Sequence, residues 1–152
     1  MSNEIEFPSG PTSSSMTVEV ADNWPVLPEG PPNILVASVA CQCNITWEIP
    51  VPHSMTITGS FQLRAFVESI GPGPEMQLGP TQNVRAVLGQ TAYTQPIPLA
   101  ANTLLGEGQD FNGVPVSGVY KIVAVLQHLN DDGNPTWISG FAEDSIKMFL
   151  SP

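Results

Sequence analysis

The sequence predicts an all-β protein: an antiparallel two-sheet β-sandwich of seven or eight strands, immunoglobulin-like, or as the alternative a jelly roll. Three observations carry this prediction. Apolar and polar residues alternate along several segments, and alternation with period two places one row of side chains on one face of a strand. No segment shows a sustained apolar stripe with the 3.6-residue spacing of a helix. Turn-forming Gly, Pro, Asn and Asp residues separate the alternating segments.

The N-terminal part of the chain divides into an arm and the start of a domain. Residues 1–15 are rich in Pro, Gly and Ser and hold almost nothing to bury. We interpret them as an arm that is flexible or ordered by a partner, and residues 16–152 as a single β-sandwich domain. Alternation begins at Met16–Val20. The connection Trp24–Pro32 follows, and its four prolines exclude a helix.

The run Leu35–Ile49 carries an apolar residue at every odd position. Its fifteen residues would extend over about 50 Å, which exceeds an ordinary strand. We therefore expect it to bend or break near Cys41–Asn44, as two strands or as one strand that crosses between sheets. Met55–Val67 repeats the alternation and predicts a second long, half-buried strand.

The remaining strands are expected to be shorter, and turn signals separate them. Pro96 and Pro98 push one of these strands toward a sheet edge. Residues 100–115 read as a long loop, and the Asp-Gly pair within Asn130–Pro135 is typical of a hairpin turn. Glu143-Asp144 marks a bulge or break between the last two strands. In chain order these candidates are Gln82–Leu88, Thr91–Leu99, Val116–Leu129, Trp137–Ala142 and Ile146–Leu150.

The two cysteines, Cys41 and Cys43, stand on one face of the predicted strand. That spacing could direct two thiolates at a metal, but zinc sites use C-x₂₋₄-C with a second ligand pair. The row around the cysteines is apolar, and a thiol in such surroundings behaves as a small hydrophobe. We interpret both as core residues and predict no metal site. An immunoglobulin domain would pair distant cysteines across its sheets, so the resemblance to that fold is architectural only.

The charge balance limits the classes of partner. Four basic residues stand against fourteen acidic ones, a formal charge of −10. Binding to nucleic acid requires several Lys and Arg residues, so it is excluded, and the same argument disfavours docking to an anionic membrane. No apolar stretch approaches the ~20 residues that cross a bilayer, which predicts no membrane insertion. The first residues lack a secretory signal, so we expect a cytoplasmic protein or one carried within an assembly.

Catalytic motifs are missing from the sequence. It has no G-x-S-x-G elbow, phosphate-binding loop or H-E-x-x-H pair, and His53 and His128 read as surface residues beside connections. Glu48 and Glu68 fall on polar faces. The turn at Asn130–Pro135 offers oxygen ligands, but the calcium-loop pattern is absent and a hairpin needs the same residues. We predict no catalytic residue and no cofactor.

The strand predicted at Val116–Leu129 is apolar on both faces, and such a strand is usually covered on both. Its second row includes Val123 and Val125. An arm or loop of the same chain, or another subunit, is expected to cover that row. Trp24 and Trp137 flank connections and are candidate exposed anchors, whereas Trp47 belongs to the apolar row of the core.

These features together predict a non-catalytic structural or interaction domain, a subunit of a homo-oligomeric or larger protein assembly. The first alternative is a carbohydrate- or peptide-binding module that uses Trp24 or Trp137 with loop residues 100–115. The second is a hydrolase with an unrecognised site, in which His53 or His128 would meet a Ser or a carboxylate in a cleft.

Overall fold

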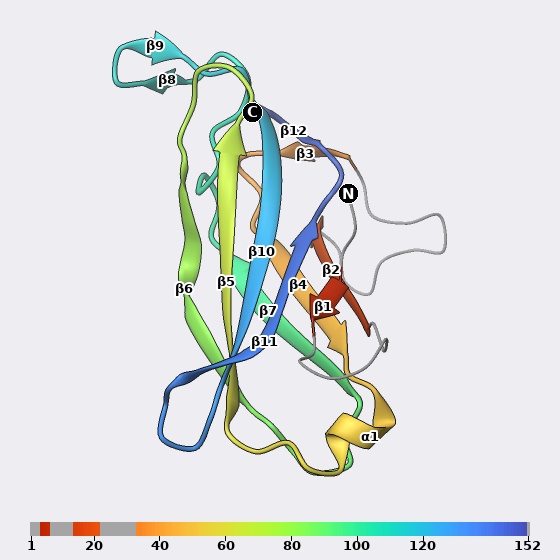
Figure 1. Cartoon of the computed structure of the whole chain (residues 1–152). Coiled ribbons are helices and arrows are strands. Elements are labelled where there is room, and N and C mark those ends of the chain that lie inside the picture. The colour runs from red at the N-terminus through yellow and green to blue at the C-terminus, as the bar shows by residue number, and fades with distance from the viewer. Residues whose placement is uncertain (1–3, 7–13, 22–32, 152) are drawn as a thin grey trace.

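A computed structural model describes residues 4–6, 14–21 and 33–151 (Figure 1). These residues form strands and one short helix. In chain order the strands are β1 (Glu4–Glu6), β2 (Ser14–Ala21), β3 (Ile34–Val36), β4 (Cys41–Glu48), β5 (Ser60–Ser69), β6 (Met76–Arg85), β7 (Ala92–Leu99), β8 (Asp110–Phe111), β9 (Val114–Pro115), β10 (Val119–Leu129), β11 (Pro135–Glu143) and β12 (Lys147–Leu150), and the helix is α1 (Val51–Ser54).

The strands form two facing layers, joined along one edge by β1, which pairs with β11 of one layer and β2 of the other, so the predicted β-sandwich is confirmed (Figure 1). One sheet has the order β2-β4-β7, and the other has β6-β5-β10-β11, with β12 continuing β11 along the edge of β10 and β3 beside β12. This is the arrangement of immunoglobulin domains, in which strands A, B and E face strands C, F and G. The short strands β1, β3, β8, β9 and β12 raise the strand count above the seven or eight predicted.

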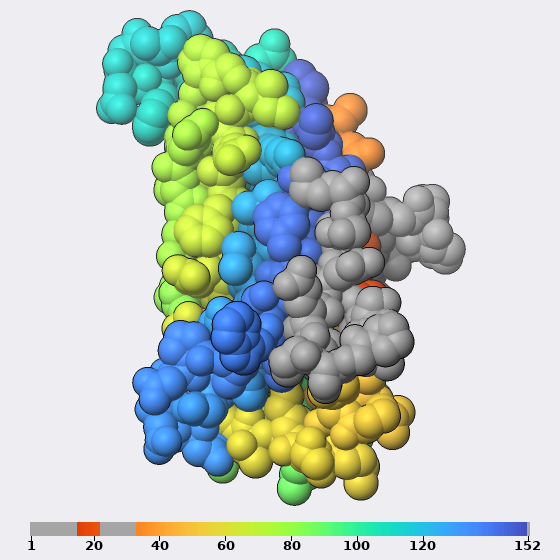
Figure 2. All heavy atoms as spheres, in the orientation of Figure 1, coloured from red at the N-terminus to blue at the C-terminus, as the bar shows by residue number. Residues whose placement is uncertain are grey.

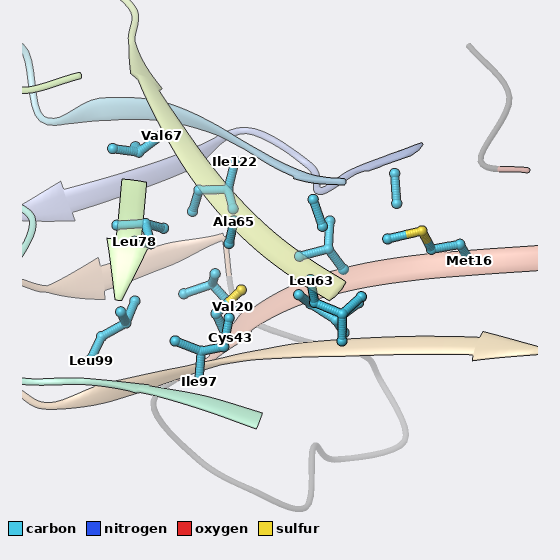
Figure 3. Close-up of a cluster of buried hydrophobic side chains, with 14 of the residues drawn as sticks. Met16, Val20, Cys43, Leu63, Ala65, Val67, Leu78, Ile97, Leu99 and Ile122 are labelled. Atoms are coloured by element: carbon cyan, nitrogen blue, oxygen red, sulfur yellow. The ribbon is translucent and has the colours of Figure 1, made fainter. Parts of the chain in front are cut away.

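Alternating residues of both sheets fill the space between them. Figure 3 shows Val20, Cys43 and Ile97 of one sheet facing Ala65 and Ile122 of the other. Toward one end of the sandwich the core is aromatic: the rings of Trp47 and Tyr93 stack at 5.2 Å, and Phe61 packs edge-on against both. Burial of large apolar side chains, about 1.5–3 kcal/mol each, is the main force that holds the sheets together.

The run Leu35–Ile49 breaks earlier than expected. The chain turns at residues 37–40, where Val39 N donates to Val36 O, and Val39 is 46% exposed. Before the turn β3 pairs in parallel with β12, and after it β4 pairs with β2 and β7 in the opposite sheet. The run therefore does become two strands in two sheets, but the predicted position of the break was wrong by a few residues.

The prediction of one strand over Met55–Val67 was wrong in its first part. Residues 51–54 form α1, whose Ser54 N donates to Pro50 O and whose Ser54 Oγ donates to Val51 O. Met55 follows the helix and is 64% exposed. Strand β5 begins only at Ser60. Prolines at the helix start suit its first turn, because their missing N–H groups would be unpaired there in any case.

Two further boundaries differ from those predicted. Strand β6 begins at Met76, well before the predicted Gln82, and ends at Arg85. The apolar residues Val87 and Leu88 lie in the following loop, where they are 49% and 63% exposed. Within the loop predicted at residues 100–115, β8 and β9 form a small hairpin. The expected edge position of β7 is confirmed, since among the described strands it pairs only with β4.

The predicted break at Glu143-Asp144 is confirmed, and it contains a buried ion pair. Lys147 is fully buried with its Nζ 3.7 Å from Asp144 Oδ2, and Asn33 Oδ1 lies 3.3 Å from the same Nζ. Asp144 Oδ2 also accepts a hydrogen bond from Val20 N at 2.9 Å. Burial raises the pKa of Asp144, and the ammonium of Lys147 opposes that rise. The pair ties β2 of one sheet to β12 of the other.

Two predictions fall largely outside the described residues. Of the expected arm, residues 1–15, the structure describes Glu4–Glu6, which pair with β2 and β11, and the first residues of β2. Trp24 and the proline-rich connection lie outside the described part. Within that part, no helix is long and apolar enough to cross a membrane.

Candidate functional site

The outer face of the larger sheet carries an apolar patch. Val123 of β10 lies opposite Phe66 of β5, and Val125 lies opposite Phe141 of β11. All four side chains are half-buried. Residues directly opposite on antiparallel strands have Cβ atoms about 5 Å apart, so each pair is in contact, and Val123 and Val125 join the two pairs because they are successive outward residues of β10. Glu143 also lies opposite Val123, and Arg64 lies opposite Val125. We call Phe66, Val123, Val125 and Phe141 the sheet patch. Figure 2 looks onto this face, where β5, β10 and β11 lie side by side.

The charges around the sheet patch balance one another. Lys121 Nζ lies 2.5 Å from Glu143 Oε1, and this bond raises the pKa of Lys121. Glu68 stands opposite Lys121. The Arg64 guanidinium lies 5.9 Å from the centre of the Phe66 ring, within the range of a cation–π contact. Two of the four basic residues of the chain therefore border the patch, together with two acidic ones.

A second surface forms at one end of the sandwich, where three loops meet (Figure 1). These loops, residues 49–59, 86–91 and 130–134, join β4 to β5, β6 to β7 and β10 to β11. Gly89 N donates to Ser54 O at 2.7 Å, and Ala86 N donates to Gly59 O at 2.9 Å, so the first two loops are bonded together. We call this surface the loop end. Antibody domains place binding loops at the corresponding end of their sandwich.

A pocket of about 340 Å³ opens at the loop end between residues 53–58 and the β10–β11 hairpin. Trp137 stands on its rim and is 84% exposed, as the sequence suggested for an anchor. Ile57 and Ile138 supply apolar walls, and Thr58 and Thr136 supply polar ones. The pocket therefore combines an exposed indole, aliphatic walls and hydrogen-bonding groups.

His128 lies at the back of this pocket, and its prediction as a surface residue was wrong. It is 5% exposed, because β10 carries its inward row through position 128. The ring packs on Phe61 at 5.4 Å. Its Nε2 lies 2.5 Å from Thr58 O, and its Nδ1 lies 2.9 Å from Thr136 Oγ1. His128 thus links the hairpin to the loop that holds α1.

A neighbouring pocket of about 320 Å³ is polar, and it shares Asn130 with the first. Arg85, Asn83 and Asp131 line it. Asn130 Oδ1 accepts hydrogen bonds from the backbone N–H groups of residues 132 and 134, at 3.0 and 2.9 Å, and Gly133 has a φ of 81°. The predicted hairpin turn is therefore observed here.

The cysteines pack in or against the core, as predicted. Cys43 is fully buried, and burial, followed by the negative charge of Asp144 and by Cys41, raises its pKa to about 12. At neutral pH it is a thiol, whereas metal binding and nucleophilic attack need a thiolate. Cys41 is half-buried. Across residues 4–6, 14–21 and 33–151, no three His, Cys, Asp or Glu side chains gather as metal ligands.

The structure separates the interaction residues suggested by the sequence. Val123 and Val125 lie together on the sheet patch, whereas Trp137 belongs to the loop end. The combination of Trp137 with loop 100–115 is wrong, because the β8–β9 hairpin of that loop lies at the opposite end of the sandwich (Figure 1). Glu48 and Glu68 are exposed, as expected.

The sequence interpretation missed several members of both surfaces. Phe66 and Phe141 complete the sheet patch, and Arg85 and His128 line the loop-end pockets. The signal for Phe66 was weak, because the other outward residues of β5 are polar. The signal for His128 was present, since it shares the parity of the inward residues of β10.

No family model and no curated protein matches this chain. Among solved structures, a β-glucosidase from Listeria innocua is similar with a TM-score of 0.48 and 10% identity, over 93% of this chain and 17% of that chain. The same enzyme with isofagomine gives 0.48 and 9% over the same shares, and with glucose 0.44 and 10% over 91% and 17%. This chain therefore spans about a sixth of the enzyme chains it resembles.

Proposed function

We propose that this protein is a non-catalytic interaction domain that self-associates through the sheet patch and thereby forms a subunit of an assembly. The observation that carries the proposal is the continuous apolar patch in the middle of an outer sheet face. In a two-layer sandwich such a face ordinarily meets water and is polar, and continuous apolar patches mark interfaces.

The second copy is favoured as the occupant because of the charges. A chain of net charge −10 repels its own copies over most of its surface. The sheet patch is bordered by Arg64 and Lys121 as well as by Glu68 and Glu143, so two copies meet there with balanced charges. A two-fold axis places the same patch on both sides of an interface, and this set of charges can complement itself.

The environment of His128 supports a role other than hydrolysis. Its two ring nitrogens lie against Thr58 O and Thr136 Oγ1. A general base in a nucleophilic triad instead needs one nitrogen toward a nucleophile and the other toward an orienting carboxylate. The ring holds two loops together, which is a structural task.

The test is the molar mass in solution, measured by size-exclusion chromatography with light scattering for the full chain and two variants. Val125→Glu places a carboxylate in the patch opposite Arg64, which can pair with it, so the fold is retained. Val114→Glu is the matched control: it makes the same charge change at a 48% exposed valine of the β8–β9 hairpin.

We expect the wild-type protein and V114E to have a molar mass of two or more chains of 16.2 kDa each, and V125E to have the mass of a single chain. The melting temperatures of the two variants should agree within a few degrees. A wild-type monomer at every concentration tested would overturn the proposal. So would a V125E variant with the mass of the wild type. A monomeric wild type combined with a destabilised V125E would instead indicate that a segment of the same chain covers the patch.

A further inference from the structure

We propose that the loop end is a second binding surface, distinct from the sheet patch, that binds a basic peptide segment of a partner protein. An apolar side chain of that segment enters the pocket beside Trp137, and Trp137 is the anchor of the interaction.

Several large apolar side chains of the loop end are exposed. Trp137 leaves 84% of its side chain in water, so the fold gains little from it. Three further large apolar side chains of the loop end are mostly exposed to water: Val51 and Met55 at 64%, and Leu88 at 63%. Trp is enriched among residues that dominate binding energy, and Met adapts its shape to varied partners. The apolar residues of this end therefore have the composition of an interface core.

The pocket lies beside Trp137. Its volume of about 340 Å³ is at the lower end of the usual range for ligand sites and suits one large side chain. Its two walls come from different loops, which the His128 ring fixes through Thr58 O and Thr136 Oγ1. Fixed walls lower the entropy lost on binding. The hydroxyl group of Thr58, which lines the pocket, can pair with the backbone of an extended peptide.

Charge selects the kind of peptide. Asp131 and Asp132 are exposed on the turn that leads to Trp137, and they outnumber the one basic residue of the loop-end pockets, Arg85. The chain as a whole has a net charge of −10, so it attracts positive partners over long range. This negative charge attracts a peptide that carries Lys and Arg residues next to the apolar side chain that enters the pocket. An acidic segment would be repelled.

The surroundings of Trp137 favour a peptide over a sugar. A sugar ring stacks on an exposed aromatic face and offers hydroxyl groups on every side, so its neighbours need to be polar. The pocket beside Trp137 has aliphatic walls from Ile57 and Ile138, and the exposed side chains elsewhere at the loop end include Val51, Met55 and Leu88. These would meet the hydroxyls of a sugar but pack well against the side chains of a peptide.

The experiment selects peptides from a library of random twelve-residue sequences displayed on phage, with the full-length protein as the target. Selection is run in parallel on W137A. The enriched peptides are then synthesised and titrated into wild type, W137A, W137F and the double variant D131N/D132N. Cellohexaose and maltohexaose are titrated as sugar probes. Ile34→Ala, at a 59% exposed residue outside the loop end, is the control for loss of an exposed apolar group.

We expect the enriched peptides to carry an aromatic or large aliphatic residue flanked by Lys or Arg. Their affinity should fall at least tenfold in W137A, fall less in W137F and stay unchanged in I34A. D131N/D132N should weaken binding a few-fold at 50 mM salt and have no effect at 0.5 M salt. Peptide binding should persist in V125E, because the loop end is distinct from the sheet patch that mediates self-association. Enrichment of the same peptides on W137A, enrichment of acidic peptides, or a response to the sugars alone would overturn the proposal.

Discussion

The buried pair of Lys147 and Asp144 yields a sharp stability prediction. Lys147 is fully buried, and the Asp144 side chain is 5% exposed. Asp144 also accepts backbone hydrogen bonds from Val20 N at 2.9 Å and Ser145 N at 2.8 Å. We predict that Lys147→Met and Asp144→Asn each destabilise the protein strongly and that the double variant is far more stable than their sum implies.

The loss of stability in each single variant depends on which charged group remains buried without its partner. Asp144→Asn leaves a buried ammonium without its carboxylate, and removal of one partner from a buried pair costs about 3–5 kcal/mol. Lys147→Met leaves a carboxylate that still accepts two backbone N–H groups, so its cost lies at the lower end of that range. The double variant leaves no charge, and we expect it within about 2 kcal/mol of the wild type. Ordinary domains have about 5–15 kcal/mol of stability, so all three variants stay folded if the wild type exceeds the lower end of that range.

The same pair sets a pH dependence. Burial raises the pKa of Asp144 above its value of 3.8 in the unfolded chain, and Lys147 opposes this, so Lys147→Met raises the pKa further. The folded state then binds the proton more tightly than the unfolded chain does. This contribution to stability is fully present below pH 3.8 and is lost as the pH rises through the raised pKa. K147M should therefore lose stability as the pH rises above 3.8, relative to the double variant, which has no carboxylate at this position.

Urea denaturation followed by circular dichroism measures all four proteins at pH 7 and pH 4.5. Equal slopes against urea are required, because they show that the unfolded states are alike. With single costs of about 3–5 and about 3 kcal/mol and a double variant within about 2 kcal/mol of the wild type, the coupling energy should be at least about 4 kcal/mol, above the usual range of about 0.5–3 kcal/mol. Additive single effects, or single variants that each cost less than about 1 kcal/mol, would show that the pair does not act as a buried unit.

Three further predictions concern the core and the hairpin turn. In the native protein, Cys41 should react with a thiol reagent before Cys43, whose pKa of about 12 and full burial protect it, and urea should expose both. Tyr120→Phe removes a 2.7 Å hydrogen bond to Leu105 O and should cost about 1 kcal/mol, or roughly 2–4 °C in melting temperature. Gly133→Ala should cost about 1–2 kcal/mol through its φ of 81° alone, because nothing lies within 4 Å of the added Cβ, and Gly133→Asn should cost less.

Period-two alternation predicted the long strands well, because burial of one face acts on every second residue of a strand. Strand β10 shows both of its rows as expected. The same rule failed at Met55–Ile57, where three residues alternate by chance after a helix. The four residues of α1 are too few to display a 3.6-residue period, so the local sequence does not indicate this helix.

Strand β12 shows a stronger limit of the alternation rule. The pattern of Ile146, Met148 and Leu150 favours burial of the even positions, yet Lys147 and Phe149 are the buried residues and Ile146 is 54% exposed. A shift of one residue exchanges the two faces. Here the register follows from contacts distant in sequence: Phe149 packs edge-on against Tyr120. No local pattern contains that information.

The candidate surfaces were predictable to different degrees for the same reason. The rows of Val123 and Val125 lie within one strand, so the sequence could indicate a second apolar face. The loop-end pocket joins residues 53–58 to residues 128–138, and this meeting depends on the whole fold. Trp137 could be suspected from the sequence, but its pocket could not.

The distribution of the four basic residues makes the two proposed surfaces separable by salt. Lys147 is buried with its carboxylate, Lys121 is bonded to an acid, and Arg64 lies over an aromatic ring. The fourth, Arg85, is exposed and lines a pocket of the loop end together with Asp131. Most of the remaining surface charge is therefore negative, which opposes self-association and favours a basic partner. Salt screens both effects. Raising the salt from 50 mM to 0.5 M should strengthen the dimer and weaken peptide binding at Trp137. Analytical ultracentrifugation and peptide titration at both salt concentrations would test this, and a parallel response of the two equilibria would contradict the assignment of separate surfaces.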